Sequence, residues 1–122
     1  MEEKRLPIKS FRDLAAKIVL LDVIPKLPSE EKYDLADQMR RASKAAPAIL
    51  AEGYAKKHLI KSWKKYLHDV MGECNEMIAH LTITTEAYGN RYRSKELEAV
   101  IDLYDQATKM LYTLAKNWKV YS

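Results

Sequence analysis

The chain has 122 residues, of which 48% are apolar and 31% are charged, and its formal net charge is +4. This composition is typical of a single folded domain and excludes an intrinsically disordered chain. Three glycines and four prolines are too few for the many turns of a β-rich fold, so we expect an all-α protein.

The cysteine content and the lack of a long apolar run indicate the cellular compartment of the protein. Cys74 is the single cysteine and has no partner for an intramolecular disulfide, which fits a reducing environment. The longest apolar run, residues 18–21, is too short for a signal peptide or a membrane span. We therefore expect a cytoplasmic protein that does not contact membranes.

The first predicted helix covers about residues 10–24, with Ser10 as its cap and Pro25 at its end. Apolar residues recur along it at helical spacing. Its last turns are apolar on all sides, which indicates either deep burial or packing against a second subunit. The residues that close the apolar ring there are Val19, Leu20, Val23 and Ile24.

The second predicted helix covers about residues 30–55, with Ser29 as its cap and two glutamates in its first turn. We expect Pro47 to kink it, because proline lacks the amide hydrogen and crowds the preceding turn. The apolar stripe of this helix consists of Leu35, Met39, Ala42, Ala46, Ile49 and Gly53.

Two further helices are predicted over about residues 60–88 and 95–119. Gly89 and Asn90 form a good end for the third helix, and Ser94 is placed to cap the fourth. In the fourth helix the predicted apolar seam is Leu97, Ile101, Tyr104, Thr108, Leu111, Ala115 and Trp118. With short connections, these elements predict one domain, residues 1–122, folded as an antiparallel up-down four-helix bundle.

Positive charge is concentrated in residues 40–68. This stretch holds eight Lys or Arg residues and one acid, a net charge of +7, whereas the flanking segments 1–39 and 69–122 are both net negative. We predict that these basic side chains face solvent and bind phosphate or carboxylate groups. They are Arg40, Arg41, Lys44, Lys56, Lys57, Lys61, Lys64 and Lys65.

Two questions about this stretch stay open at the level of sequence. A lysine-rich helix face is often merely solvated surface, and the charge pattern favours a binding surface only slightly over that alternative. The basic residues also lie on consecutive helices, so they either merge into one patch or lie at opposite ends of the bundle.

The aromatic residues nearby favour contact with the phosphate backbone over base stacking. Trp63 is predicted to lie on the core stripe of its helix and Tyr66 on the flank of that stripe. Tyr54 is the one aromatic residue placed to be exposed beside the lysines. Two arginines and six lysines suit backbone contacts better than base-specific recognition.

Catalysis and metal binding are not expected. His68 with Asp69, and Glu76 with His80, are pairs without the further carboxylates that a metal site in a helical bundle needs. Cys74 lies on an apolar stripe and is predicted to be buried. The chain has no glycine-rich phosphate loop and no nucleophile motif. We expect a protein without cofactor or enzymatic activity.

The segment from Met39 to Tyr54, which contains Arg40-Arg41-Ala42 and Ala51-Glu52-Gly53-Tyr54, resembles a known family. This is the four-helix-bundle family first noted in intervening sequences of bacterial 23S ribosomal RNA genes. The resemblance extends to residues 27–35 and to the aromatic, Gly72 and Glu76 pattern of the third helix, and covers about residues 11–118. The chain departs from the family pattern at Lys44-Ala45 and lacks the asparagine that usually precedes the Ala-Glu-Gly segment.

The resemblance implies a homo-oligomeric ring, a pentamer, which would account for the apolar end of the first helix. Accessory variability determinant proteins of diversity-generating retroelements are similar in fold and associate with RNA and a reverse transcriptase. We therefore expect an oligomeric accessory protein that binds the phosphate backbone of RNA or DNA and assists a reverse transcriptase. The alternative is a protein-interaction scaffold with an acidic protein partner and no nucleic acid.

Overall fold

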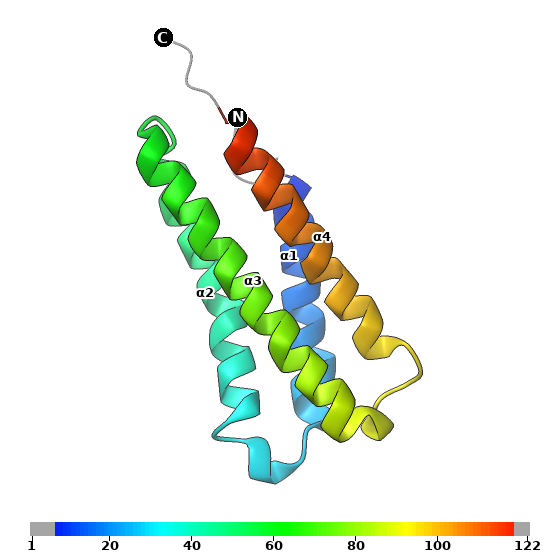
Figure 1. The fold of residues 1–122 in the computed structure, drawn as a ribbon. Helices are drawn as coiled ribbons and strands as arrows, with labels where there is room; N and C mark the ends of the chain where they lie inside the picture. The colour runs from blue at the N-terminus through cyan, green and yellow to red at the C-terminus, as the bar shows by residue number, and fades with distance from the viewer. Residues whose placement is uncertain (1–6, 119–122) are drawn as a thin grey trace.

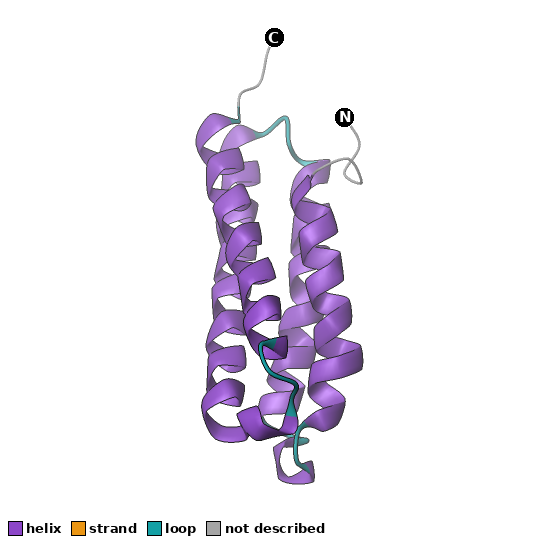
Figure 2. Ribbon diagram, turned by 90° about the vertical axis from the view of Figure 1, so that its right-hand side faces the viewer, coloured by secondary structure: helices purple, strands orange, loops and turns teal. Residues whose placement is uncertain are grey.

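The protein is described by a computed structural model that places residues 7–118, with side chains from residue 13 onward. Four long helices lie side by side (Figure 1): α1 (Pro7–Ile18), α2 (Leu35–Ala55), α3 (Ile60–Tyr88) and α4 (Glu96–Asn117). Residues 7–118 contain helices, turns and loops but no strand (Figure 2). The all-α prediction is confirmed.

The first helix begins earlier than predicted and ends through two distorted turns. α1 starts at Pro7, because proline suits the first helical position, and Ser10 lies inside the helix instead of capping it. After Ile18 the chain continues as a π-helical turn, Val19–Val23, and a 3-10 turn, Ile24–Lys26. Val19 and Val23, four positions apart and therefore on the same side of the chain, are both fully buried.

The second helix begins later than predicted. Ser29–Glu31 forms a separate 3-10 turn, and α2 starts only at Leu35, because the backbone of Asp34 (φ −127°, ψ −98°) breaks the helical path. The predicted cap at Ser29 is therefore wrong for α2. The helix then continues without interruption through Pro47.

The ends of α3 and α4 use different residues from those that the sequence suggested. Gly89 follows α3 with an ordinary helical φ of −55°, so its capacity for left-handed backbone is not used. Lys95, not Ser94, precedes α4, and it adopts the left-handed conformation with φ 66°. The predicted end of this helix at residue 119 lies outside the described residues; α4 ends at Asn117.

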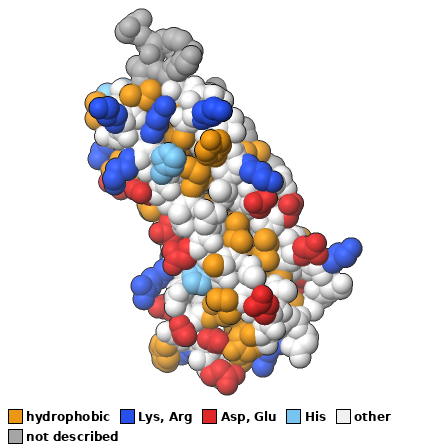
Figure 3. Space-filling view, in the orientation of Figure 1, with side chains coloured by type: hydrophobic (Ala, Val, Ile, Leu, Met, Phe, Trp, Pro, Cys, Tyr) orange, Lys and Arg blue, Asp and Glu red, His pale blue; other side chains and the backbone are white. Residues whose placement is uncertain are grey.

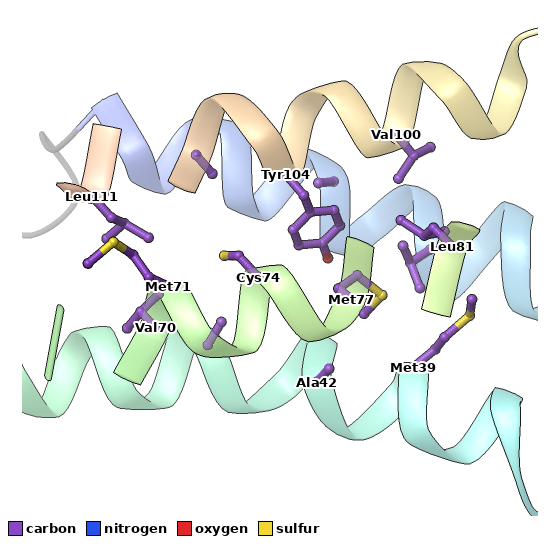
Figure 4. Close-up of a cluster of buried hydrophobic side chains, with 14 of the residues drawn as sticks. Met39, Ala42, Val70, Met71, Cys74, Met77, Leu81, Val100, Tyr104 and Leu111 are labelled. Carbon is purple, nitrogen blue, oxygen red and sulfur yellow. The ribbon is translucent and has the colours of Figure 1, made fainter. Parts of the chain in front are cut away.

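The core is built from one face of each helix (Figure 4). Cys74 is buried as predicted, at 1% exposure. In α4, Val100 and Ala107 occupy the core in place of the predicted Ile101 and Thr108, because the packing buries the seam that alternates by three and four from Leu97 and not the one that alternates by four and three. Residues at matching heights on α3 and α4 meet in pairs, such as Met71 with Leu111 and Leu81 with Val100.

The helices contact one another in a simple order. α2 packs against α3, α3 packs against α4, and α1 packs against α4, while the last turns of the α1 segment also reach α2. At Gly53 the two helices α2 and α3 approach so closely that a Cβ atom there would lie 2.4 Å from Cβ of Tyr66. Glycine is required at that position because any side chain would force the helices apart.

The end of the molecule that carries the α1–α2 and α3–α4 connections is held by contacts between distant parts of the chain. Nζ of Lys26 donates to both carboxylate oxygens of Glu96 at 3.0 Å. The hydroxyl of Tyr92 donates to the carbonyl of Val23 at 2.7 Å, and this bond is buried. The hydroxyl of Tyr88 donates to Glu31. We call these residues, with Arg91, the connector end.

The pKa values of two connector residues reflect these contacts. Burial raises the pKa of Tyr92 to about 12, with the Glu96 carboxylate adding to the effect. Burial alone would raise the pKa of Glu96, but the hydrogen bonds from Lys26 and from the backbone of Arg93 outweigh it, so the pKa is lowered. The ionised carboxylate of Glu96 is therefore the form that the fold stabilises.

Candidate nucleic-acid interface

Five of the eight predicted site residues lie together at the opposite end of the molecule, around the turn between α2 and α3. We call this group the lysine tip: Lys56, Lys57, Lys61, Lys64 and Lys65. Three backbone hydrogen bonds close the turn, from Lys56 to Gly53, from Lys57 to Tyr54 and from Leu59 to Lys56. None of the five lysines is buried. The prediction of a solvent-facing basic group is confirmed for this part.

Figure 3 shows the distribution of charge over one face. Lys and Arg side chains gather near the end that carries the α2–α3 turn, whereas acidic side chains predominate toward the connector end. Lys61 and Lys64 make no ion pair or hydrogen bond with another described residue, and Lys65 pairs with Asp69 at 3.5 Å on the exposed surface. An exposed pair of this kind contributes at most about 1 kcal/mol, so Lys65 can exchange its partner at little cost.

Lys56 is held against α3 by a short hydrogen-bond chain. Its ammonium group donates to the hydroxyl of Tyr66 at 3.1 Å, and that hydroxyl donates to Glu52 at 3.2 Å. The bond to Tyr66 is the main reason why the pKa of Lys56 is raised, with Glu52 as a smaller cause. Glu52, the one acid inside the basic stretch, therefore orients the tip instead of neutralising it as a whole.

Lys57 covers an aromatic cluster beneath the turn. Its ammonium group lies 4.3 Å from the ring centre of Tyr54, within the range of a cation–π contact. Tyr54 meets Trp63 edge to face at 5.8 Å, and Trp63 meets Trp118 in the same way at 5.5 Å. The expectation that Tyr54 is exposed is wrong: it is 7% exposed, because this stack buries it. Trp63 is fully buried, as predicted.

The remaining three predicted site residues lie elsewhere. Arg40, Arg41 and Lys44 are near the middle of α2, and Arg41 is fifteen positions from Lys56, about 22 Å along the helix. Asp37 lies 3.2 Å from Arg41 and 4.0 Å from Arg40. The basic stretch therefore does not form one patch, and the two acids that pair with it, Asp37 and Asp69, lie just outside the window in which its charge was counted.

The α3 dipole adds to the positive potential of the tip, whereas α2, which ends at Ala55, brings the negative end of a second dipole to the same turn. The first turn of α3 contains no acid, and Leu59 at its N-cap makes no capping bond through its side chain. Lys61 and Lys64 thus lie near the positive end of the α3 dipole, a placement that slightly destabilises the helix. Lys56 and Lys57 lie instead at the C-terminal end of α2, where positive charge is favourable.

One basic residue of this end was missed from the sequence. Lys116 is exposed on the last turn of α4, and the contact of Trp118 with Trp63 brings that turn beside the start of α3. It was overlooked because it belongs to a segment that is net negative. No pattern in the sequence would have placed it there, because the register between α3 and α4 is set by their packing.

The described residues offer little for other chemistry. No group of three or more His, Cys, Asp or Glu residues within the described part gathers closely enough to hold a metal ion. His80 is paired with Glu76 at 3.5 Å. Likewise, none of the helices of residues 7–118 is apolar over a length that would cross a bilayer.

Comparison with known proteins identifies a family. A model of the 23S rRNA-intervening sequence protein family matches residues 8–113, a range that includes all eight predicted site residues. This confirms the resemblance noted over residues 39–54. Searches of curated proteins and of solved structures returned no match.

Proposed function

The chain belongs to the 23S rRNA-intervening sequence protein family, and we propose that it is a non-enzymatic accessory protein that binds the phosphate backbone of RNA or DNA through its lysine tip. The observation that carries this proposal is the gathering of five accessible lysines at one turn, of which Lys65 alone forms an ion pair with a carboxylate among the described residues. Phosphates are the anions that such a group of ammonium ions binds most readily, because each contact releases condensed counterions.

The basic residues form two separate groups, and we assign binding to only one of them. The lysine tip is the binding surface, whereas Arg40 and Arg41 already have Asp37 as a partner. Lys44, between the two groups, contributes through long-range attraction. Lysine presents a point charge without the planar fork of arginine, so the tip suits contact with backbone phosphates and not discrimination among bases.

We also propose that the four helices form an antiparallel up-down bundle and that copies of it assemble into a homo-oligomeric ring, a pentamer. The bundle is supported by which helices pack together: α2 with α3, α3 with α4 and α1 with α4. Leu14 and Leu21, seven positions apart on α1 and its π-helical continuation, are 51% and 66% exposed and support the ring. A mass of a single 14.1 kDa chain in light scattering would exclude the ring.

The cellular setting belongs to the same proposal: a cytoplasmic protein that assists a reverse transcriptase by presenting RNA. The test of partnership is affinity capture with and without nuclease. A reverse transcriptase bridged by RNA is lost after digestion. A partner that survives digestion and binds through the tip would favour an acidic protein as the ligand.

Binding itself is tested by fluorescence anisotropy with labelled RNA across a salt series. We expect affinity to fall steeply with salt and to fall further when Lys57, Lys61, Lys64 and Lys65 are changed to Gln. The matched control removes four exposed positive charges at the other end of the molecule, by changing Lys32, Arg91, Arg93 and Lys95 to Gln. Equal losses in the two variants, or no dependence on salt, would refute the lysine tip as the site.

A further inference from the structure

A tyrosine on α4 is exposed among basic residues. Tyr112 is 58% exposed, although most large side chains of α4 are buried or half-buried. Lys109 precedes it by three positions and Lys116 follows it by four, so the three side chains share one face of the helix. Lys109 is paired with Asp105 at 3.0 Å, so Lys116 is the available positive charge beside the ring.

The register of α3 against α4 places this tyrosine beside the lysine tip. Leu111 meets Met71 in the core (Figure 4), and Trp118 meets Trp63 at 5.5 Å. Tyr112 therefore lies level with His68 and Asp69 on α3. One turn nearer the end of the molecule, Lys116 is level with Lys64 and Lys65. Tyr112 and Lys116 therefore lie toward the same end of the molecule as the lysine tip, where Figure 3 shows Lys and Arg side chains gathered.

The other aromatic residues near the tip cannot offer a ring face to a ligand. Tyr54 and Trp63 are buried, and the ring of Tyr66 carries the ammonium group of Lys56 at 5.3 Å. Within the described part of this surface, Tyr112 is the aromatic side chain with most of its area in solvent. The hydroxyl has no hydrogen bond to another described residue, so the ring can reorient.

We propose that Tyr112 stacks on an unpaired base while the surrounding lysines hold the flanking phosphates, so that the surface prefers single-stranded over double-stranded nucleic acid. This inference rests on the proposed function and specifies its ligand. A base is accessible to an aromatic face only where it is not stacked within a duplex, and stacking on a protein aromatic tolerates every base. The combination of a charged row with one exposed ring is the arrangement that single strands require.

The test compares full-length variants by anisotropy with two labelled probes, an oligouridine that forms no secondary structure and a blunt RNA duplex. Tyr112→Ala should weaken binding of the oligouridine by about 5- to 100-fold and leave binding of the duplex unchanged. Tyr112→Phe should bind both probes like the wild type, because the ring face is retained. The matched control is Tyr33→Ala, which removes an 86% exposed tyrosine from the connector side of the molecule.

The outcomes separate this inference from the proposed function. If the lysine variant weakens binding but Tyr112→Ala does not, stacking is refuted and the phosphate-binding function stands. If the wild type binds neither probe, both are refuted. If Tyr112→Ala changes the mass in light scattering, the tyrosine belongs to a subunit contact and the stacking role is overturned. Far-UV circular dichroism of each variant confirms that the fold is kept.

Discussion

The two ends of the molecule use their charged and polar residues for different purposes. At the connector end, hydrogen bonds join residues between 57 and 70 positions apart, and the ammonium group of Lys26 is matched by the carboxylate of Glu96. At the lysine tip, the side-chain hydrogen bonds among the described residues join residues only 10 and 14 positions apart, and most of the lysines have no carboxylate of their own. Charge stabilises the tertiary structure at one end and stays available for a ligand at the other.

The sequence motif that carries the family resemblance lies directly beneath the lysine tip. In the Glu52-Gly53-Tyr54 segment, Glu52 accepts from Tyr66, Gly53 permits close approach of α2 and α3, and Tyr54 is buried on Trp63. All three residues hold the α2–α3 pair together beneath the lysines. This motif is structural, and it positions the turn that carries Lys56 and Lys57.

The largest effect is expected from a methyl group at the base of the tip. In Gly53→Ala the new Cβ would lie 2.4 Å from Cβ and 2.8 Å from Cγ of Tyr66, atoms too near the backbone to move aside. We expect the free energy of unfolding to fall by about 2–3 kcal/mol in urea denaturation, with weaker RNA binding. In the control Gly72→Ala the Cβ meets nothing within 4 Å, so helix propensity should raise stability by up to about 1 kcal/mol. Destabilisation by both would contradict the close-approach explanation.

A single hydroxyl tests the connector end. Tyr92→Phe removes the buried 2.7 Å hydrogen bond to the carbonyl of Val23 and should lower the free energy of unfolding by about 1–2 kcal/mol. The raised pKa of about 12 gives a second readout. Because the unfolded chain releases the Tyr92 proton near the ordinary value of 10.0, its contribution should be lost as the pH rises through the folded pKa. The variant should lack this part of the alkaline loss, and an unchanged profile would speak against the burial that raises this pKa.

The Lys26–Glu96 ion pair should make the free energy of unfolding depend on pH in the acidic range. The pKa of Glu96 is lower in the folded protein than its ordinary value of 4.5, so its stabilising contribution is present above that value and is lost as the pH falls through the folded pKa. Glu96→Gln should lower the free energy of unfolding by about 1 kcal/mol at neutral pH. Wild type and variant should converge at low pH. A difference that stays constant with pH would mean that the charge of Glu96 is not what stabilises this end.

The smallest effect on stability is expected where the largest effect on binding lies. Changing Lys57, Lys61, Lys64 and Lys65 to Gln should alter the free energy of unfolding by no more than about 0.5 kcal/mol. The sign should be stabilising at low salt, because like charges near the positive end of the α3 dipole repel, and the gain should shrink as salt screens them. A loss of several kcal/mol in thermal denaturation would show that the lysines serve the fold.

Much of the helical content followed from local chemistry. The apolar periodicity predicted α3 with its observed bounds, and burial of Trp63 and Cys74, because a long helix with a clear stripe needs no tertiary information. The helix starts were less predictable. Ser10, Ser29 and Ser94 each looked like a cap and none serves as one for α1, α2 or α4, since Pro7, the Ser29–Glu31 turn and the left-handed Lys95 set those boundaries instead.

The candidate site divides in the same way. The sequence by itself determined that positive charge is concentrated in residues 40–68 and faces outward, because helical periodicity decides which side of a helix a residue occupies. Only the tertiary structure decided that Arg40 and Arg41 lie far from the lysine tip and beside Asp37, that Tyr54 is buried, and that α4 contributes Tyr112 and Lys116. Those facts depend on which helices pack together and in which register, and no local pattern in the chain encodes the distance between two helices.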